Sequence, residues 1–261
     1  MSTLGRYRRQ ALANRLSGWG GRAAVIAPAL VLGIGAAFAT RTVGGTLAGV
    51  VLGAIAGFAV LWQLASSRAI RLALEAWGTD RGLAVADPAP LPERMRWIDS
   101  TDGEMGPGLT GPIAGGEGGV GHYTYTTGSG KDRTDHPYTL AWTEIAVRDR
   151  AAVSLGRREF GSGLFTGLIG ALSAWREVEL ESVDFEKRFA LWVSDETDDL
   201  VVRRFFTPAM IARCLDHPPA GRLEIGAGVL CLSLERHLLE PDDLTDAAAE
   251  LERWADALRR R

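Results

Sequence analysis

The sequence predicts an α+β protein in which an N-terminal transmembrane helical hairpin precedes a soluble domain with an antiparallel sheet and flanking helices. Three observations predict this class: two long uncharged runs near the N-terminus, several short alternating segments separated by turn residues, and an amphipathic segment at the C-terminus. The predicted organisation is a basic tail at 1–22, the hairpin at 23–67, a membrane-proximal helix at 68–85, a Pro/Gly-rich connection at 86–121 and a cytosolic α+β domain at 122–261.

The composition of the 261 residues excludes several classes of protein. The chain is 46% hydrophobic and 23% charged, which excludes a disordered chain. Two cysteines, Cys214 and Cys231, are too few for a disulfide scaffold, and both lie in apolar runs that suit core residues. The formal net charge of −3 gives no general attraction to nucleic acid, so we expect no nucleic-acid partner.

The predicted hairpin rests on two runs without charge, Ala23–Thr40 and Thr42–Ser67, which are separated by Arg41. A helix rises about 1.5 Å per residue and a bilayer core is about 30 Å thick, so the spans should lie at about 23–40 and 46–66. Neither run has the polar face that a helix of a soluble protein needs. Two alternatives stay open: a buried pair of soluble helices, and a cleaved signal peptide with Ala37-Phe38-Ala39 at its cleavage site.

The distribution of arginine predicts the orientation of the hairpin. Five arginines and no acid lie in 1–22, and the turn holds Arg41. Because positive charge is retained on the cytoplasmic side, we expect a multi-pass protein of the inner (plasma) membrane with both termini cytoplasmic and the lipid bilayer as a partner. In the tail, Leu12, Leu16 and Trp19 share one helical face and suit the inner leaflet.

A stripe of small residues marks the second span, where Gly45, Gly49, Gly53 and Gly57 are spaced four apart. Glycine at this spacing lets another helix backbone approach closely. We expect the stripe to pack within the hairpin. The alternative is a homo-oligomer formed through these four glycines. No ionisable residue lies in either run to line a pore.

The next two segments differ in regularity. Ile70, Leu74 and Trp77 repeat at helical spacing, so we expect a helix from Ser67 to about Asp80. The connection at 86–121 contains five prolines and the run GGEGGVG, and we expect it to be irregular, with one short strand near 96–98.

The C-terminal half alternates between strand and helix patterns. Apolar/polar alternation and intervening turns predict a hairpin of strands 122–127 and 138–147, and a second hairpin over 222–239 that turns at 226–228. Three further strands are predicted at 152–155, 178–182 and 187–194. An acidic cluster at 195–199 begins a helix that Thr207-Pro208 should break into two. Pro241 begins the last helix, whose predicted apolar stripe is Leu244, Ala248, Leu251, Trp254 and Leu258.

No motif assigns a catalytic, cofactor-binding or metal-binding residue, and we expect no cofactor. The run GSGK at 128–131 lacks the rest of a phosphate loop, and GGEGGVG at 115–121 suits a flexible linker. Four histidines lack the spacing of a zinc site; they are His122, His136, His217 and His237. Asp132, Asp135 and His136 share a loop that suits a solvated turn. The carboxylates Glu179, Glu181, Asp184 and Glu186 could suggest paired acid/base groups. Glu179 and Glu181 share one face of the predicted strand and suit its wet side, and we expect Arg188 to pair with Asp184 or Glu186.

The block 181–215 resembles the closing segment of an uncharacterised family of bacterial two-span membrane proteins with a cytosolic α+β domain. The matching features are Glu181-Ser182, Asp184-Phe185, Phe189, the pair Thr207-Pro208 and the hairpin start Tyr123-x-Tyr125. The resemblance implies the architecture alone, and no activity or site residue comes with it.

The sequence thus leaves three hypotheses about function. The first is a membrane-anchored cytosolic binding or scaffolding module, which the lack of a catalytic motif favours. The second is a membrane-tethered enzyme with a non-standard site at the Gly-rich loops 115–121 and 161–170. The third is an accessory subunit of an oligomeric transporter or channel, assembled through the glycine stripe.

Overall fold

The computed structural model describes residues 43–90, 103–146, 152–158 and 175–259, together with residues 7, 9, 27, 30, 31, 92 and 95. The chain forms two compact units. The first comprises Met1–Trp77 with Leu239–Pro241, and the second comprises Gly78–Leu238 with Asp242–Arg261. The basic tail at 1–22 and the first predicted span at 23–40 fall almost entirely outside the described residues.

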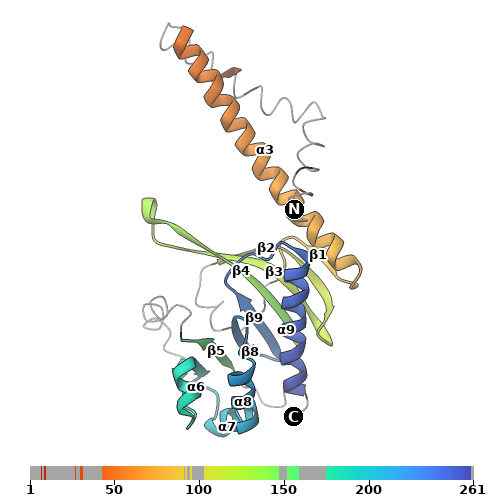
Figure 1. Cartoon of the computed structure of the whole chain (residues 1–261), viewed down its shortest axis with the longest axis vertical. Helices are drawn as coiled ribbons and strands as arrows, with labels where there is room; N and C mark the ends of the chain where they lie inside the picture. Colours follow the sequence, from red (N-terminus) through yellow and green to blue (C-terminus); the bar gives the residue numbers. More distant parts are fainter. Residues whose placement is uncertain are drawn as a thin grey trace. The chain divides into compact units, whose positions relative to one another are not determined.

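The described part of the first unit is dominated by helix α3, Val43–Thr79 (Figure 1). Its buried side chains repeat every four residues as Leu61, Ala65, Ala69, Ala73 and Trp77, the period of one helical face. Large apolar side chains on other faces are exposed, including Val51, Leu52, Ile55 and Val60. The helix predicted from Ser67 to about Asp80 is confirmed as the end of α3.

The described residues contain no helix with the length and apolarity needed to cross a bilayer. About 20 consecutive apolar residues are needed for one crossing. The prediction of a multi-pass protein of the inner membrane with both termini cytoplasmic is therefore wrong, and the transmembrane hairpin is not supported. Gly53 and Gly57 are buried, whereas the burial of Gly45 and Gly49 is not described. Contact with a lipid bilayer and self-association through the stripe stay predictions.

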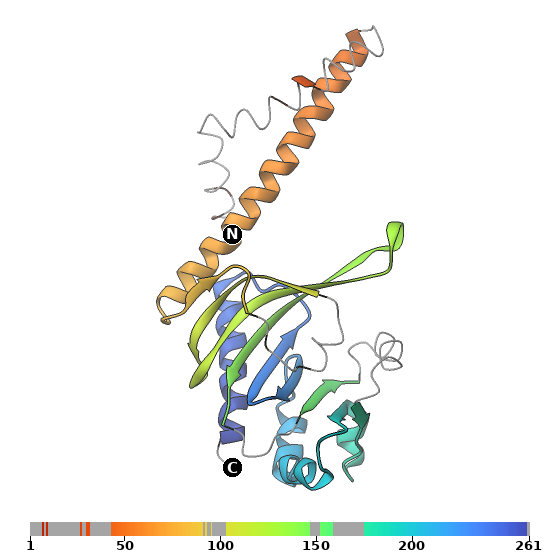
Figure 2. The same ribbon diagram turned by 180° about the vertical axis from the view of Figure 1, so that it is seen from behind.

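The second unit is built on a nine-stranded sheet of order β1-β2-β3-β4-β9-β8-β5-β7-β6. Every neighbouring pair is antiparallel. The strands are β1 Ala84–Ala86, β2 Gly103–Ile113, β3 Gly116–Thr127, β4 Thr134–Glu144, β5 Val153–Arg157, β6 Trp175–Glu177, β7 Phe189–Ser194, β8 Arg222–Gly226 and β9 Val229–Leu234. The prediction of an α+β class with an antiparallel sheet is confirmed (Figures 1 and 2).

The helices of this unit are α6 Val183–Arg188, α7 Asp199–Phe205, α8 Pro208–Asp216 and α9 Pro241–Arg259, with a short 3₁₀ turn, η1, at Gly130–Asp132. The break between α7 and α8 falls at Thr207-Pro208, as predicted. The Thr207 side chain accepts a hydrogen bond from the Met210 N–H, and Pro208 occupies the first turn of α8, where a missing N–H costs nothing.

The two faces of the sheet have different covers. On one face, side chains of β5 and β8 meet α8 and α9, where Leu155, Ile225, Cys214 and Trp254 line a shared apolar interior. On the other face, Tyr123, Leu140, Trp142 and Cys231 form a core with Ala89 and Met95. In α9 the residues Leu244, Ala247, Leu251, Trp254 and Ala255 are buried. Leu244, Leu251 and Trp254 confirm three members of the predicted stripe.

The expectation of an irregular connection at 86–121 is wrong. Two long strands, β2 and β3, occupy most of it, and GGEGGVG belongs to β3 rather than to a flexible linker. The glycines are there because neighbours approach closely. A Cβ on Gly119 would lie 2.3 Å from the Leu109 carbonyl oxygen and 2.6 Å from the Trp142 ring, and one on Gly118 would lie 2.0 Å from the Trp142 carbonyl oxygen.

Two smaller predictions also fail. Residues 178–182 are not a strand, because the ladder with β7 ends at Glu177 and beyond it Val178 N–H makes a single bond to the Leu191 carbonyl at 2.9 Å. Residues 183–188 form a helix, α6, which the strand pattern starting at Lys187 missed. The predicted strand near 96–98 lies outside the described residues.

The close packing of β3 against Trp142 gives a stability prediction. We expect Gly119→Ala to lower the free energy of unfolding by about 1–3 kcal/mol, since the new Cβ must displace backbone and an aromatic ring. Gly106→Ala in β2 is the matched control, because its Cβ would meet nothing closer than 3.7 Å. Urea denaturation of both variants measures the difference. Equal losses in the two variants would show that close packing does not explain the glycine run.

Candidate functional site

An open groove of about 580 Å³ lies in the second unit. One wall is the extended segment Val178–Ser182, and the other is formed by α7 and α8. Its lining combines apolar and charged side chains, and consists of Val178, Glu179, Leu180, Glu181, Ser182, Asp199, Val202, Arg203, Phe206, Pro208, Ile211, Ala212 and Leu215. A concave surface that combines apolar side chains with a few polar groups is typical of a binding site.

Two helix starts position the groove wall. Asp198 caps α7, and its carboxylate accepts a hydrogen bond from the Leu200 N–H at 2.7 Å. Thr207 caps α8 and accepts from the Met210 N–H at 3.4 Å. Because α7 ends at Phe205 and α8 begins at Pro208, the turn between them places Phe206 and Pro208 at the groove.

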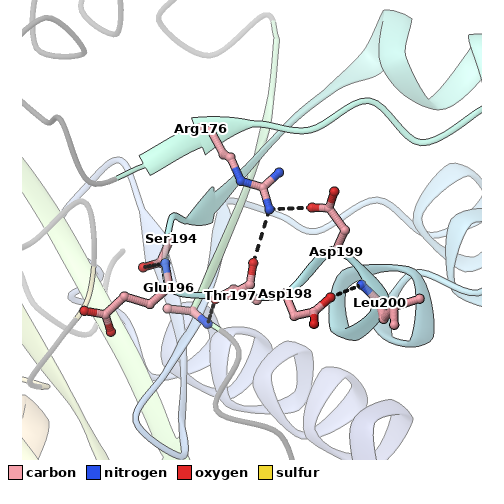
Figure 3. A network of polar contacts seen from close by, with 8 residues as sticks. Arg176, Ser194, Glu196, Thr197, Asp198, Asp199 and Leu200 are labelled. Atoms are coloured by element: carbon pink, nitrogen blue, oxygen red, sulfur yellow. Dashed lines mark hydrogen bonds and ion pairs between the residues drawn. The ribbon is translucent and has the colours of Figure 1, made fainter.

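A polar network ties the beginning of α7 to the sheet (Figure 3). The Arg176 guanidinium, on β6, donates to the Thr197 carbonyl oxygen at 3.2 Å and pairs with the Asp199 carboxylate. Thr197 is buried, and its hydroxyl accepts a bond from the Ala152 N–H, just before β5, at 3.2 Å. The loop after β7 is thereby held by residues of two other segments, and Asp199 is kept at the groove.

The charges along the groove are mostly acidic. Glu181 pairs with Arg203 at 3.1 Å, and both side chains are exposed. Glu179 is exposed and has no ion pair among the described residues. The surrounding segment 177–199 contains nine acidic residues and two basic ones. The lining of the groove therefore presents carboxylates to solvent and includes one arginine, Arg203.

Two exposed apolar side chains are sequence neighbours of lining residues. Among the described residues of the second unit, two large hydrophobic side chains are exposed: Val183 at 66% and Leu200 at 62%. Each directly follows a lining residue, Ser182 and Asp199 respectively. Exposed apolar groups gathered beside a concave surface indicate an interaction site more strongly than scattered ones do.

The structure places the four carboxylates singled out in the sequence on or near this groove. Glu179 and Glu181 line it, whereas Asp184 and Glu186 lie in α6. Arg188, expected to pair with Asp184 or Glu186, instead has a hydrogen bond from its guanidinium to the Leu215 carbonyl oxygen at 3.4 Å. Glu179 and Glu181 are thus exposed as expected, although the segment that carries them is not a strand.

The expectation that Asp132, Asp135 and His136 share a loop is wrong, because Asp135 and His136 lie in β4 opposite Thr126 and Tyr125, whereas Asp132 ends the 3₁₀ turn η1. Asp135 accepts from Thr126 at 2.8 Å and from Arg133 at 3.4 Å, and the hydrogen bond with the Thr126 hydroxyl is the main reason that its pKa is lowered. His136 stacks on Tyr125 and bonds Thr127. The described residues contain no group of three side chains suited to hold a metal ion.

Two histidines that the sequence did not predict as a pair lie together: His122 is in the middle of β3, and His237 follows β9. The rings of His122 and His237 stack with their centroids 4.5 Å apart, although the two residues are 115 positions apart in the sequence. His122 Nε2–H donates to the Leu238 carbonyl oxygen at 2.8 Å. Burial, and secondarily His237, lowers the pKa of His122 to about 4. Burial also lowers the pKa of His237. No sequence spacing connects these residues.

The sheet also contains a buried polar cluster that sequence patterns missed. Tyr138 lies on β4, whereas Arg222 and Glu224 lie on β8, with β9 between the two strands, and Glu224 is 2% exposed. Burial raises the pKa of Tyr138 and lowers that of Arg222. Cys231 lies directly opposite Glu224, and burial raises the pKa of its thiol. Cys231 and Cys214 are both buried, so the prediction that they are core residues is confirmed.

Comparisons with known proteins give little further information. No family model matches the chain, and no curated protein matches it. Among solved structures, the chain is similar to the crystal structure of the mycobacterial trehalose monomycolate transport factor A, TtfA, at 11% identity and a TM-score of 0.43. The match covers 74% of this chain and 96% of that one. A likeness at this level carries no argument about function.

The cap of α7 gives a testable prediction about the groove wall. We expect Asp198→Ala to lower the free energy of unfolding by about 1 kcal/mol, because the Leu200 N–H loses its acceptor. Asp198→Asn keeps a capping oxygen and should have nearly the stability of the wild type. Urea denaturation of both variants checks this. A loss of equal size in Asp198→Asn would assign the effect to charge rather than to capping.

The buried His122 gives a prediction about pH. An unfolded histidine binds its proton near pH 6.5, whereas folded His122 does so only near pH 4. Its contribution to stability is therefore fully present above about pH 6.5 and is lost as the pH falls toward 4, by about 3 kcal/mol. The drop in unfolding free energy between these pH values should be smaller in His122→Gln than in wild type. His217→Gln, at an exposed histidine, is the control, and an unchanged drop in His122→Gln would contradict the prediction.

Proposed function

We propose that the second unit is a binding module that takes a segment of another polypeptide into the groove between Val178–Ser182 and helices α7 and α8. One observation carries the proposal: an open groove is lined mostly by apolar side chains, and the exposed Val183 and Leu200 directly follow two of its lining residues in the sequence. Removing a side chain of this size from water stabilises a complex by about 1.5–3 kcal/mol. A partner that covers both therefore gains from the hydrophobic effect.

The width and openness of the groove favour a polypeptide over a small molecule. Small ligands bind in sites that enclose most of their surface. Here the volume is about 580 Å³, but the groove is open to solvent along a wall of two helices and one extended segment. A peptide can leave its own polar side in water while its apolar side is buried.

The chemistry of the groove supports recognition rather than catalysis. A carboxyl group that acts as a general acid needs an apolar pocket around it. The Glu181 side chain is instead 84% exposed and paired with Arg203, and Asp199 pairs with Arg176. The enzyme hypothesis placed its site at loops 115–121 and 161–170. The first of these lies in and beside β3, and the second is outside the described residues.

The experiment is a selection of peptides from a random library on the full-length chain, followed by affinity measurements. We expect selected peptides to bind at least about tenfold more weakly to Ala212→Trp, because Ala212 is exposed and lines the groove, so that the indole fills it. Ala209→Trp is the matched control, since Ala209 is exposed on the same helix but does not line the groove.

Two results would overturn this proposal. One is a library that yields no binding peptide. The other is a set of peptides whose affinity is the same for Ala212→Trp and Ala209→Trp, which would place their binding elsewhere. Circular dichroism of both variants checks that each keeps the fold.

A further inference from the structure

We propose that the segment bound in the groove is a cationic amphipathic helix, an inference that rests on the proposed function and names its partner class. The groove combines two features that such a helix complements. Its lining carries three carboxylates and one arginine, and all the other lining residues except Ser182 are apolar.

The charge argument begins with Glu179. This carboxylate is exposed at the groove and lacks an ion pair among the described residues. Glu181 has one partner, Arg203, in an exposed pair that contributes little to stability. Both carboxylates can therefore accept a guanidinium from a ligand, and arginine makes the stronger contact because it can bond both oxygens at once.

The surroundings strengthen the attraction over a longer range. The stretch 177–216, which includes both walls of the groove, holds ten acidic and five basic residues. An excess of one sign around a groove speeds the approach of ligands of the opposite sign and disfavours ligands of the same sign. An anionic or neutral segment with the same apolar face would lack this attraction.

The apolar residues of the wall indicate a helical ligand. Val202 in α7 and Phe206 at its C-terminal cap are four residues apart. In α8, Ile211, Ala212 and Leu215 follow Pro208 by three, four and seven residues. Side chains at these spacings form ridges on the helix surface, and the ridges of a second helix can pack into the grooves between them. A ligand with apolar residues at i, i+3 or i+4, and i+7 would fit beside these ridges and would cover Val183 and Leu200.

Three synthetic peptides of about 16 residues test the inference on the full-length chain, a length that permits a helix. The first has leucines on one helical face and arginines elsewhere. The second replaces each arginine with glutamate. The third is the first peptide with a central proline, which breaks the helix. Affinities are measured by fluorescence anisotropy at about 50 mM and about 500 mM salt.

We expect the arginine peptide to bind at least about tenfold tighter than its glutamate twin and than its proline variant, and to weaken as salt rises. Glu179→Lys should weaken it at least about threefold. Glu252→Lys, at an exposed glutamate of α9, should leave the affinity unchanged. Ala212→Trp should weaken binding, whereas Ala209→Trp should not.

The outcomes separate this inference from the proposed function. If the glutamate twin or the proline variant binds as well as the arginine peptide, with loss in Ala212→Trp, the groove binds peptides and the inference about their class is wrong. If the arginine peptide binds Ala212→Trp and wild type equally, it binds outside the groove and the inference is overturned. If neither these peptides nor the library yields binding that depends on Ala212, the proposed function itself fails.

Discussion

The pairing of β4 with β9 is the interaction on which the rest of the second unit depends. It joins the meander β1–β4 to the strands β5–β9, through a register from Thr139 opposite Leu234 to Glu144 opposite Val229. Polar side chains fix the same junction: the Thr139 hydroxyl donates to the Arg236 carbonyl oxygen and accepts from the Leu238 N–H, both at 2.8 Å. A slip of one residue would exchange the two buried faces, so these bonds and the core of Leu140 and Trp142 specify one register together.

The groove depends on the far half of this sheet. Its walls follow the short strands β6 and β7 at the edge opposite β1, where regular pairing ends at Glu177. There the backbone leaves the ladder, and side chains such as Arg176 and Thr197 take over the task of holding it. The groove is therefore a consequence of where the sheet ends, and its shape rests on a few capped and paired residues rather than on a continuous core.

Sequence patterns predicted what local chemistry determines. The alternation at 138–144, the Thr207-Pro208 break and the start of α9 at Pro241 are all present in the structure. Local propensity treats glycine as a loop residue and so predicts a linker at GGEGGVG, whereas the Trp142 ring, 23 positions beyond Gly119, needs the space that a side chain there would fill. The dipeptide Ala114-Gly115, with φ of 50° and 76°, forms the turn between β2 and β3, as Ala227-Gly228, with φ of 50° and 82°, forms the turn between β8 and β9. The groove itself could not be predicted, since Glu179, Arg203 and Leu215 meet only after the chain folds.

The order of strands along the chain has a consequence for synthesis on the ribosome. β4 ends at Glu144, and its partner β9 begins at Val229. At about 5–20 residues per second, roughly 4–17 s pass before the partner emerges. During that interval the nascent chain carries an open strand edge beside Leu140 and Trp142, the kind of edge that pairs with other chains and aggregates. The cell must keep neighbouring nascent chains apart, or shield this edge, until the last third of the polypeptide is made.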